Sequence, residues 1–207
     1  MKIAMFGATG VVGAALLKLA VDQGHDVRIL ARSARRVPIP DLDIELGDAL
    51  DLRAVTKTVT GCDAVMSSLG GFGDVESIDS GTANIMTAMR TAGVRRLVVM
   101  QGFHIPFPGD PHNAGVRFVS VMLRLRSPRL PARSHALGAM LRDCHDLDWT
   151  LIRAPMVKRA PATGRAQIGI LRLGPQSRVT TGDLAEVMMT ALADPATIRT
   201  APMVRSR

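Results

Sequence analysis

Three glycines near the start of the chain have the spacing of a turn that can bind a diphosphate. Residues 6–13 read FGATGVVG, a GxxGxxG pattern between an apolar run and a segment of helical periodicity. Glycine permits the sharp turn and lets the backbone approach a pyrophosphate, and the amides at the start of the next helix attract phosphates. In this context the pattern predicts a dinucleotide site, and a tight turn without ligand is the alternative. The residues assigned to the site here are Gly7, Thr9, Gly10, Val11, Val12 and Gly13.

A basic segment follows the second predicted strand and bears on which dinucleotide would bind. Arg32 ends that strand, and Ser33, Arg35 and Arg36 follow it. An acidic residue at this point holds the ribose hydroxyls of NAD, whereas arginine accommodates the 2′-phosphate of NADP. Because a guanidinium fork matches phosphate geometry, Arg32, with Arg35 and Arg36 nearby, favours NADP(H) as the cofactor. A solvated basic loop is the alternative.

The elements that would position these residues alternate between apolar runs and helix-period segments. Strands are predicted at 2–7, 26–32, 43–46, 62–69, 96–100 and 149–153, and helices at 11–23, from 51 to about 58, 79–91, 134–144 and 183–193. This alternation predicts an α/β fold, a Rossmann-type doubly wound parallel sheet, in a single domain over residues 1–207. The stretches near 102–133 and 156–178 are predicted excursions over the carboxyl edge of the sheet, where ligands bind in such folds.

Composition restricts the compartment and the partners. Hydrophobic residues make up 47% of the chain and charged residues 21%, and no apolar run is long enough to span a bilayer. The chain enters a strand pattern at once, so we expect no signal peptide, no membrane partner and a cytoplasmic location. Cys62 and Cys144 are too few for a disulfide framework or a structural zinc site, and no metal is expected.

The net charge of +8 raises the question of a nucleic-acid partner. Of 26 basic residues only Lys2, Lys18, Lys57 and Lys158 are lysines, and the chain has five Phe, one Trp and no Tyr. So few aromatic residues leave little to stack on bases, and no nucleic-acid-binding module is recognisable. We therefore expect a small-molecule partner rather than a nucleic acid, and the oligomeric state stays open.

With these residues together, the chain resembles the atypical short-chain dehydrogenase/reductase superfamily. Within it, the likeness is to the small NAD(P)H-binding proteins that include biliverdin-IXβ reductase (flavin reductase) and relatives of the NmrA regulators. The resemblance implies that Asp48 and Ala49 lie by the adenine, Ser68, Leu69 and Gly70 along the ribose and pyrophosphate, and Pro155 and Met156 near the nicotinamide. Asp48 as a helix N-cap and Pro155 as a strand terminator are the alternatives. The landmarks are residues 7–13, Arg32, 47–49, 63–65, 93–98, 147–155 and 183–185.

The superfamily's usual alcohol chemistry is excluded, because it uses a tyrosine whose pKa a nearby lysine lowers. The chain has no tyrosine, Gln101 and Gly102 stand where a serine is usual, and Leu130 and Ser134 lie where the pair would be. Two functions stay open. One is an NADPH-dependent reductase that transfers hydride to a conjugated flavin, tetrapyrrole or quinone acceptor; the other is a non-catalytic NADP(H)-binding redox sensor of the NmrA type.

Candidates for the acceptor side lie in and after the loop that follows the fifth predicted strand. His104 and His112, near Asp110, could donate a proton because histidine titrates near neutral pH, whereas His25, His135 and His145 are expected to be structural. A set of arginines could attract an anionic acceptor such as FMN. The alternative is an amphipathic helix with Phe118, Val121, Met122 and Leu125 facing inward. The arginines are Arg117, Arg124, Arg126, Arg129 and Arg133.

Overall fold

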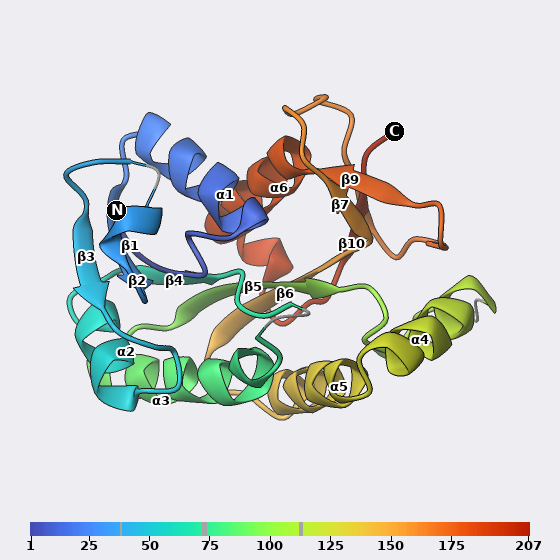
Figure 1. The fold of residues 1–207 in the computed structure, drawn as a ribbon, viewed down its shortest axis with the longest axis horizontal. Helices are drawn as coiled ribbons and strands as arrows, with labels where there is room; N and C mark the ends of the chain where they lie inside the picture. The colour runs from blue at the N-terminus through green and yellow to red at the C-terminus, as the bar shows by residue number, and fades with distance from the viewer. Residues whose placement is uncertain (38, 72–73, 112–113) are drawn as a thin grey trace.

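The computed structural model describes residues 1–37, 39–71, 74–111 and 114–207, and its elements alternate as predicted (Figure 1). The strands are β1 (Lys2–Phe6), β2 (Asp26–Ala31), β3 (Asp43–Leu46), β4 (Ala64–Ser67), β5 (Arg96–Gly102), β6 (Asp148–Ala154), β7 (Met156–Lys158), β8 (Gln167–Gly169), β9 (Arg178–Thr180) and β10 (Met203–Arg205). The helices are α1 (Val11–Asp22), α2 (Leu52–Val59), α3 (Thr82–Ala92), α4 (Ala114–Arg126), α5 (Arg129–Arg142) and α6 (Thr181–Ala193). Short helical turns are η1 (Ala34–Arg36), η2 (Ser77–Gly81) and η3 (Pro195–Thr197).

The main sheet has eight strands in the order β3-β2-β1-β4-β5-β6-β10-β8, and β7 pairs with β9 in a separate small sheet. All pairings in the main sheet are parallel except that of β8 with β10. Helices α1 and α6 cover one face, and α2, α3 and α5 cover the other (Figure 1). The predicted Rossmann-type doubly wound fold is therefore confirmed, with its switch of strand order between β1 and β4.

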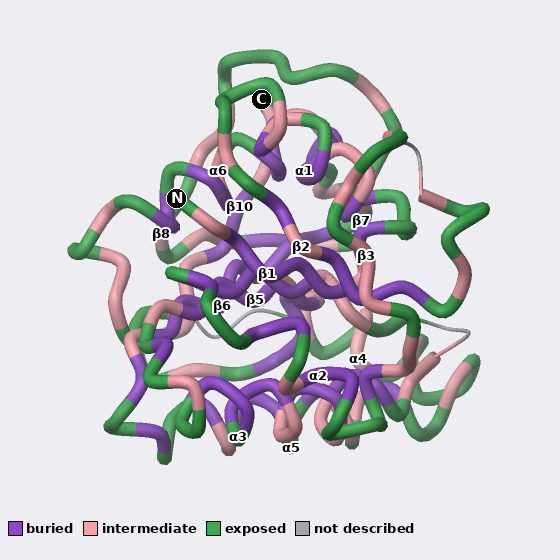
Figure 2. Tube along the Cα trace, turned by 90° about the vertical axis from the view of Figure 1, so that its left-hand side faces the viewer, coloured by how far each residue is buried: buried purple, intermediate pink, exposed green. Residues whose placement is uncertain are grey.

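Burial explains why the short strands of the sheet centre form. All four residues of β4 are buried, and so are the last four of β1, since helices cover both faces. Figure 2 shows this buried layer along the middle of the sheet. On α1 the buried positions include Val12, Leu16 and Ala20, the helical spacing expected from the sequence.

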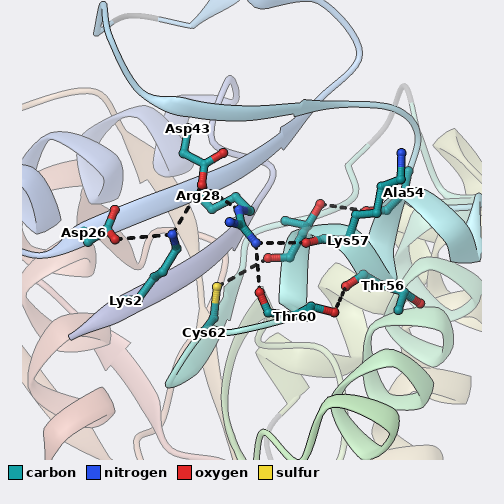
Figure 3. A network of polar contacts seen from close by, with 10 residues as sticks. Lys2, Asp26, Arg28, Asp43, Ala54, Thr56, Lys57, Thr60 and Cys62 are labelled. Carbon is teal, nitrogen blue, oxygen red and sulfur yellow. Dashed lines mark hydrogen bonds and ion pairs between the residues drawn. The ribbon is translucent and has the colours of Figure 1, made fainter.

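A polar network lies at the amino edge of the sheet, where the parallel strands begin (Figure 3). The Arg28 guanidinium donates to Asp43 Oδ2 at 2.6 Å and to the carbonyl oxygens of Lys57 and Thr60 at 3.0 and 2.8 Å. Those carbonyls lie at the C-terminal end of α2, which a cation stabilises. Lys2 Nζ adds ion pairs of 3.4 Å to Asp26 and to Asp43. The network ties the first three strands to the end of α2.

The predicted excursions contain more regular structure than the sequence indicated. Helix α4 lies in the first, and α5 begins at Arg129, five residues before the predicted start at 134. Pro131 does not prevent this because it falls in the first turn, where the backbone N–H has no helical partner. Strands β7 to β10 have three residues each, too few to show periodicity.

Candidate cofactor and acceptor site

A groove lies at the carboxyl edge of the sheet, at the switch point between β1 and β4. Strands β1, β2 and β4 are parallel, so the segments that follow them meet at this edge. The groove encloses about 160 Å³. Its lining residues are Phe6, Gly7, Thr9, Gly10, Leu30, Ala31, Arg32, Gly47, Asp48, Ala49, Ser68, Leu69, Gly70, Asp74 and Ser77.

The glycine turn at the floor of the groove leaves no room for side chains. Gly7 has φ +79°, and a Cβ there would lie 2.7 Å from the Ser68 carbonyl oxygen. A Cβ on Gly13 would lie 2.0 Å from the Gly7 carbonyl oxygen, so α1 packs directly on the turn. Gly10, the N-cap of α1, provides no side-chain cap, and the amides of the first turn have no helical partner. This cradle fits a diphosphate, because unpaired amides and a helix dipole face the open groove.

Arg32 stands at the rim of the groove beside two carboxylates. Its Nη1 lies 3.3 Å from Asp74 Oδ2 and 4.0 Å from Asp48 Oδ2, and its side chain is 64% exposed. Asp48 also accepts from the Leu50 amide at 2.9 Å, whereas Asp51 is the N-cap of α2. Arg32 is therefore held close to the groove and can reach an anion there.

The structure brings together most of the predicted cofactor residues, but not all. Val11 is exposed at the start of α1 and Val12 is buried against the sheet, so neither side chain lines the groove. Arg35 and Arg36 are exposed in η1 and do not line the groove either. Asp74 and Ser77 line it without having been predicted, since the segment after Gly70 shows no period that would have indicated its path.

A second, largely apolar cavity of about 290 Å³ adjoins the groove. Gly70 lines the groove and Gly71 lines the cavity. Gln101, which lines the cavity, donates from Nε2 to the carbonyl oxygen of Leu69, which lines the groove, at 3.0 Å. Pro155 and Met156, predicted near the nicotinamide, line this cavity rather than the groove. Its other lining residues are Gly102, Phe103, His104, Val119, Leu123, Leu130, Ala154, Gly174 and Pro175.

His104 is the ionisable side chain in this lining. It is 5% exposed, and its Nε2 is buried without a hydrogen-bond partner among the described residues. Burial, with a smaller contribution from the nearby His135, lowers the pKa of His104 to about 4. The imidazole is therefore neutral at pH 7, so the expectation that it titrates near neutral pH is wrong.

Asp110, the carboxylate expected near His104, has other hydrogen-bond partners. Asp110 Oδ1 accepts from Arg153 Nη2 at 2.6 Å, and Asp110 Oδ2 accepts from the Phe107 amide at 2.7 Å. Both carboxylate oxygens of Asp110 are thus engaged away from His104. His112 lies outside the described residues. The described residues contain no group of three or more metal-ligating side chains.

The arginines expected to attract an anionic acceptor do not line the apolar cavity. Arg133 donates to Asp79 Oδ1 at 3.0 Å, and Arg117 lines a separate hollow beside Pro111. The helix considered as the alternative exists as α4, but its predicted orientation is wrong. The four apolar side chains that were expected to face inward are exposed: Phe118, Val121, Met122 and Leu125.

The chain belongs to a family of NAD(P)H-binding proteins, since the sequence profile of that family matches residues 7–195. This confirms the resemblance drawn from the sequence and supports a nicotinamide cofactor for the chain. An uncharacterised protein of Mycobacterium bovis is 36% identical over 108 residues, 51% of this chain and 12% of that protein. The 3-diazoavenalumate denitrifying reductase of a Streptomyces species is 34% identical over 125 residues, 54% of this chain and 41% of the enzyme.

These curated relatives are therefore matched over less than half of their own length. Among solved structures, ChuY of Escherichia coli O157:H7, described as an anaerobillin reductase, superposes with a TM-score of 0.83. The match covers 100% of this chain and 97% of ChuY at 19% identity, which shows a shared fold.

Proposed function

We propose that this protein is an NADP(H)-dependent reductase that transfers hydride to a conjugated acceptor of the flavin, tetrapyrrole or quinone type. The observation that supports this most is that two consecutive residues line the two hollows, Gly70 the groove and Gly71 the apolar cavity. An apolar cavity with few polar groups suits a flat, conjugated molecule. The likeness to a reductase at 34% identity supports the same reaction class.

Each part of the groove has a task in this proposal. The Gly7–Gly10 turn and the first amides of α1 bind the diphosphate. Arg32 binds the 2′-phosphate; its guanidinium has five N–H donors, so it can do so while it still contacts Asp74. Pro155 and Met156, which line the apolar cavity, would contact the nicotinamide. When bound, the reduced cofactor supplies a hydride, and one proton from solvent completes the two-electron reduction.

His104 serves in this proposal as a neutral hydrogen-bonding group for the acceptor. A neutral imidazole in an apolar cavity can polarise a carbonyl or ring nitrogen without carrying a charge. Because its pKa of about 4 keeps it neutral from pH 5 upward, its titration leaves the rate unchanged between pH 5 and 8. His104→Gln should retain part of kcat, and His104→Leu should lower kcat about tenfold or more with NADPH affinity unchanged.

The test of the function is turnover with purified protein. NADPH oxidation is followed by absorbance with FMN, a water-soluble quinone and a linear tetrapyrrole as separate acceptors. A rate that rises in proportion to protein concentration with at least one acceptor is expected. Tight NADP⁺ binding with no oxidation by any acceptor would contradict the proposal and favour the non-catalytic redox sensor.

A further inference from the structure

Helix α4 presents a continuous apolar stripe to solvent. The exposed fractions are 56% for Phe118, 57% for Val121, 49% for Met122 and 75% for Leu125. Their spacing is i, i+3, i+4 and i+7, which places them on one face of the helix. Large apolar side chains gathered in a patch, rather than scattered singly, mark an interaction surface. We call these four residues the α4 stripe.

The other side of α4 already has its partner. Val116 and Val119 pack against a cluster formed by Phe103, Leu173 and Met203. Val119 and Leu123 line the apolar cavity. The helix thus has two apolar faces, and only the inner one is used within the described residues. Figure 1 shows α4 at the periphery of the molecule, beyond α5 and away from the sheet.

Positive charge flanks the α4 stripe. Between Asp110 and Asp143 the sequence contains six arginines and no acidic residue. Successive helical residues are turned by about 100°, so Arg117 and Arg124 lie along one border of the stripe and Arg126 along the other. The ion pairs among the described residues include neither Arg117 nor Arg124. An apolar band bordered by arginines is typical of a helix that lies in a membrane interface.

We propose that α4 docks this protein onto a membrane surface rich in anionic lipid. The stripe would enter the boundary between headgroups and acyl chains, and the arginines would contact lipid phosphates. At 13 residues α4 is about 20 Å long, short of the roughly 30 Å hydrocarbon core, so it lies in the plane. None of the helices in the described parts of the chain has the length and apolarity to cross a bilayer.

Charge favours lipid over a second copy of the chain on this face. A two-fold contact through α4 would bring Arg117 and Arg124 of both copies together, on helices that have no acidic residue. Like charges placed together oppose such a contact, whereas anionic headgroups neutralise them. The proposal departs from the expectation of no membrane partner. That expectation rested on the lack of a segment long enough to span a bilayer, and the apolar residues of α4 were considered as an inward face.

Vesicle binding tests the proposal without any cofactor. Wild-type protein is sedimented with vesicles of phosphatidylcholine alone and of phosphatidylcholine mixed with an equal part of phosphatidylglycerol. We expect binding to the anionic vesicles that weakens at high salt, and far less to phosphatidylcholine. Leu125→Glu should reduce binding tenfold or more, since it removes an apolar group that would enter the lipid and adds a charge that anionic headgroups repel. Arg124→Gln should reduce binding about fivefold.

Ile170→Glu is the matched control, because Ile170 is 66% exposed but lies outside α4. It should bind vesicles like the wild type, and circular dichroism should show all variants folded. Absence of vesicle binding by folded wild-type protein would overturn the proposal. So would light scattering that shows a wild-type dimer converted to monomer by Leu125→Glu, since the stripe would then join two copies.

Membrane docking also favours one class of electron acceptor for the enzyme, an inference that rests on the proposed reductase function. Because Val119 and Leu123 wall the cavity from the same helix, a quinone with a hydrocarbon tail would enter from the lipid side. With such a quinone in anionic vesicles, Leu125→Glu should be slower than wild type, and the two should be equal with a water-soluble quinone. Equal rates in vesicles would overturn this step and leave the reductase proposal intact.

Discussion

Each edge of the main sheet has an arginine beside carboxylates, but the two arginines differ in exposure and in how fully they are bonded within the protein. At the amino edge, Arg28 satisfies a carboxylate and two helix-terminal carbonyls, with its side chain 22% exposed (Figure 3). At the carboxyl edge, Arg32 is 64% exposed, and its ion pairs are with Asp74 at 3.3 Å and Asp48 at 4.0 Å. The carboxylate and carbonyls around Arg28 are satisfied within the protein. At the carboxyl edge, the first-turn amides of α1 have no helical partner, and Nε2 of His104 has no hydrogen-bond partner among the described residues.

This difference indicates that the amino edge contributes mainly to stability and the carboxyl edge mainly to ligand binding. Polar groups satisfied within the protein contribute to the free energy of unfolding, whereas unpaired ones at an open groove are available to a ligand. Substitution of a satisfied side chain at the amino edge should therefore change stability and leave dinucleotide affinity alone. Substitution of Arg32 or Gly10, which face the open groove, should do the reverse.

The largest expected effect follows from Gly10→Val. A valine side chain would fill the space above the turn that a diphosphate needs, and we expect NADPH and NADH affinity to fall by about a hundredfold or more. Isothermal titration calorimetry measures this loss. Among the described residues, a Cβ at position 10 meets one atom within 4 Å, the Gly7 carbonyl oxygen at 3.2 Å, so the thermal midpoint should change little. Gly13→Ala is the contrasting variant: its Cβ, 2.0 Å from that oxygen, should disturb folding itself.

Arg32→Ala should separate the two cofactors. Loss of charge-assisted hydrogen bonds to a 2′-phosphate should weaken NADPH binding by about 10- to 100-fold, with NADH binding nearly unchanged. Arg35→Ala, a change in the exposed η1 turn, is the control and should alter either affinity less than about twofold. Equal weakening of both cofactors by Arg32→Ala would remove the case for NADP(H).

Arg28→Ala tests the amino edge. The variant leaves two carbonyls at the end of α2 without their donor, and among the described residues Asp43 keeps only its ion pair with Lys2. We expect a loss of about 1–2 kcal/mol in the free energy of unfolding. Denaturant unfolding gives this value, and NADPH affinity should stay within experimental error. Arg95→Ala, which removes a more exposed contact to Asp148, should cost clearly less. If Arg28→Ala weakens NADPH binding as strongly as Arg32→Ala, the separation of the edges fails.

The smallest expected effect is a pH dependence of stability at Asp43. Burial raises the pKa of Asp43, but the hydrogen bond and charge of Arg28 outweigh it and bring the pKa below its usual value. A carboxyl with a lowered pKa stabilises the fold above its unfolded pKa and loses that contribution as pH falls through the folded value. Asp43→Asn should thus be less stable than wild type at pH 7, with a difference that shrinks below about pH 4. A difference independent of pH would contradict the assigned ion pair.

The periodic spacing of apolar residues along the sequence was enough to predict the fold. The fully apolar strands and the helices that end at Gly24 and Gly93 gave clear periods and clear stops, and both glycines have positive φ. The glycine turn and Arg32 were placed correctly in space because the parallel sheet fixes where strand ends meet. Strands of three residues and the path of Asp74 and Ser77 have no local signal, so they could not be predicted.

The acceptor side was the harder part for a physical reason. A helix with apolar residues on two faces gives no unique inward side. The alternative interpretation therefore turned Phe118 and Leu125 inward, whereas Val119 and Leu123 line the apolar cavity. The neutral state of His104 depends on its burial among residues distant in sequence, which no spacing reveals. Tertiary packing, rather than local preference, decides both.

The central claim is that the carboxyl-edge groove binds NADP(H) through the α1 amides and Arg32. Calorimetric titration of the folded protein with NADPH and with NADH tests it most directly. We expect saturable binding of both, with NADPH at least about tenfold tighter because of the extra phosphate at Arg32. Absence of heat with either dinucleotide at millimolar concentration, on protein shown to be folded, would contradict the claim.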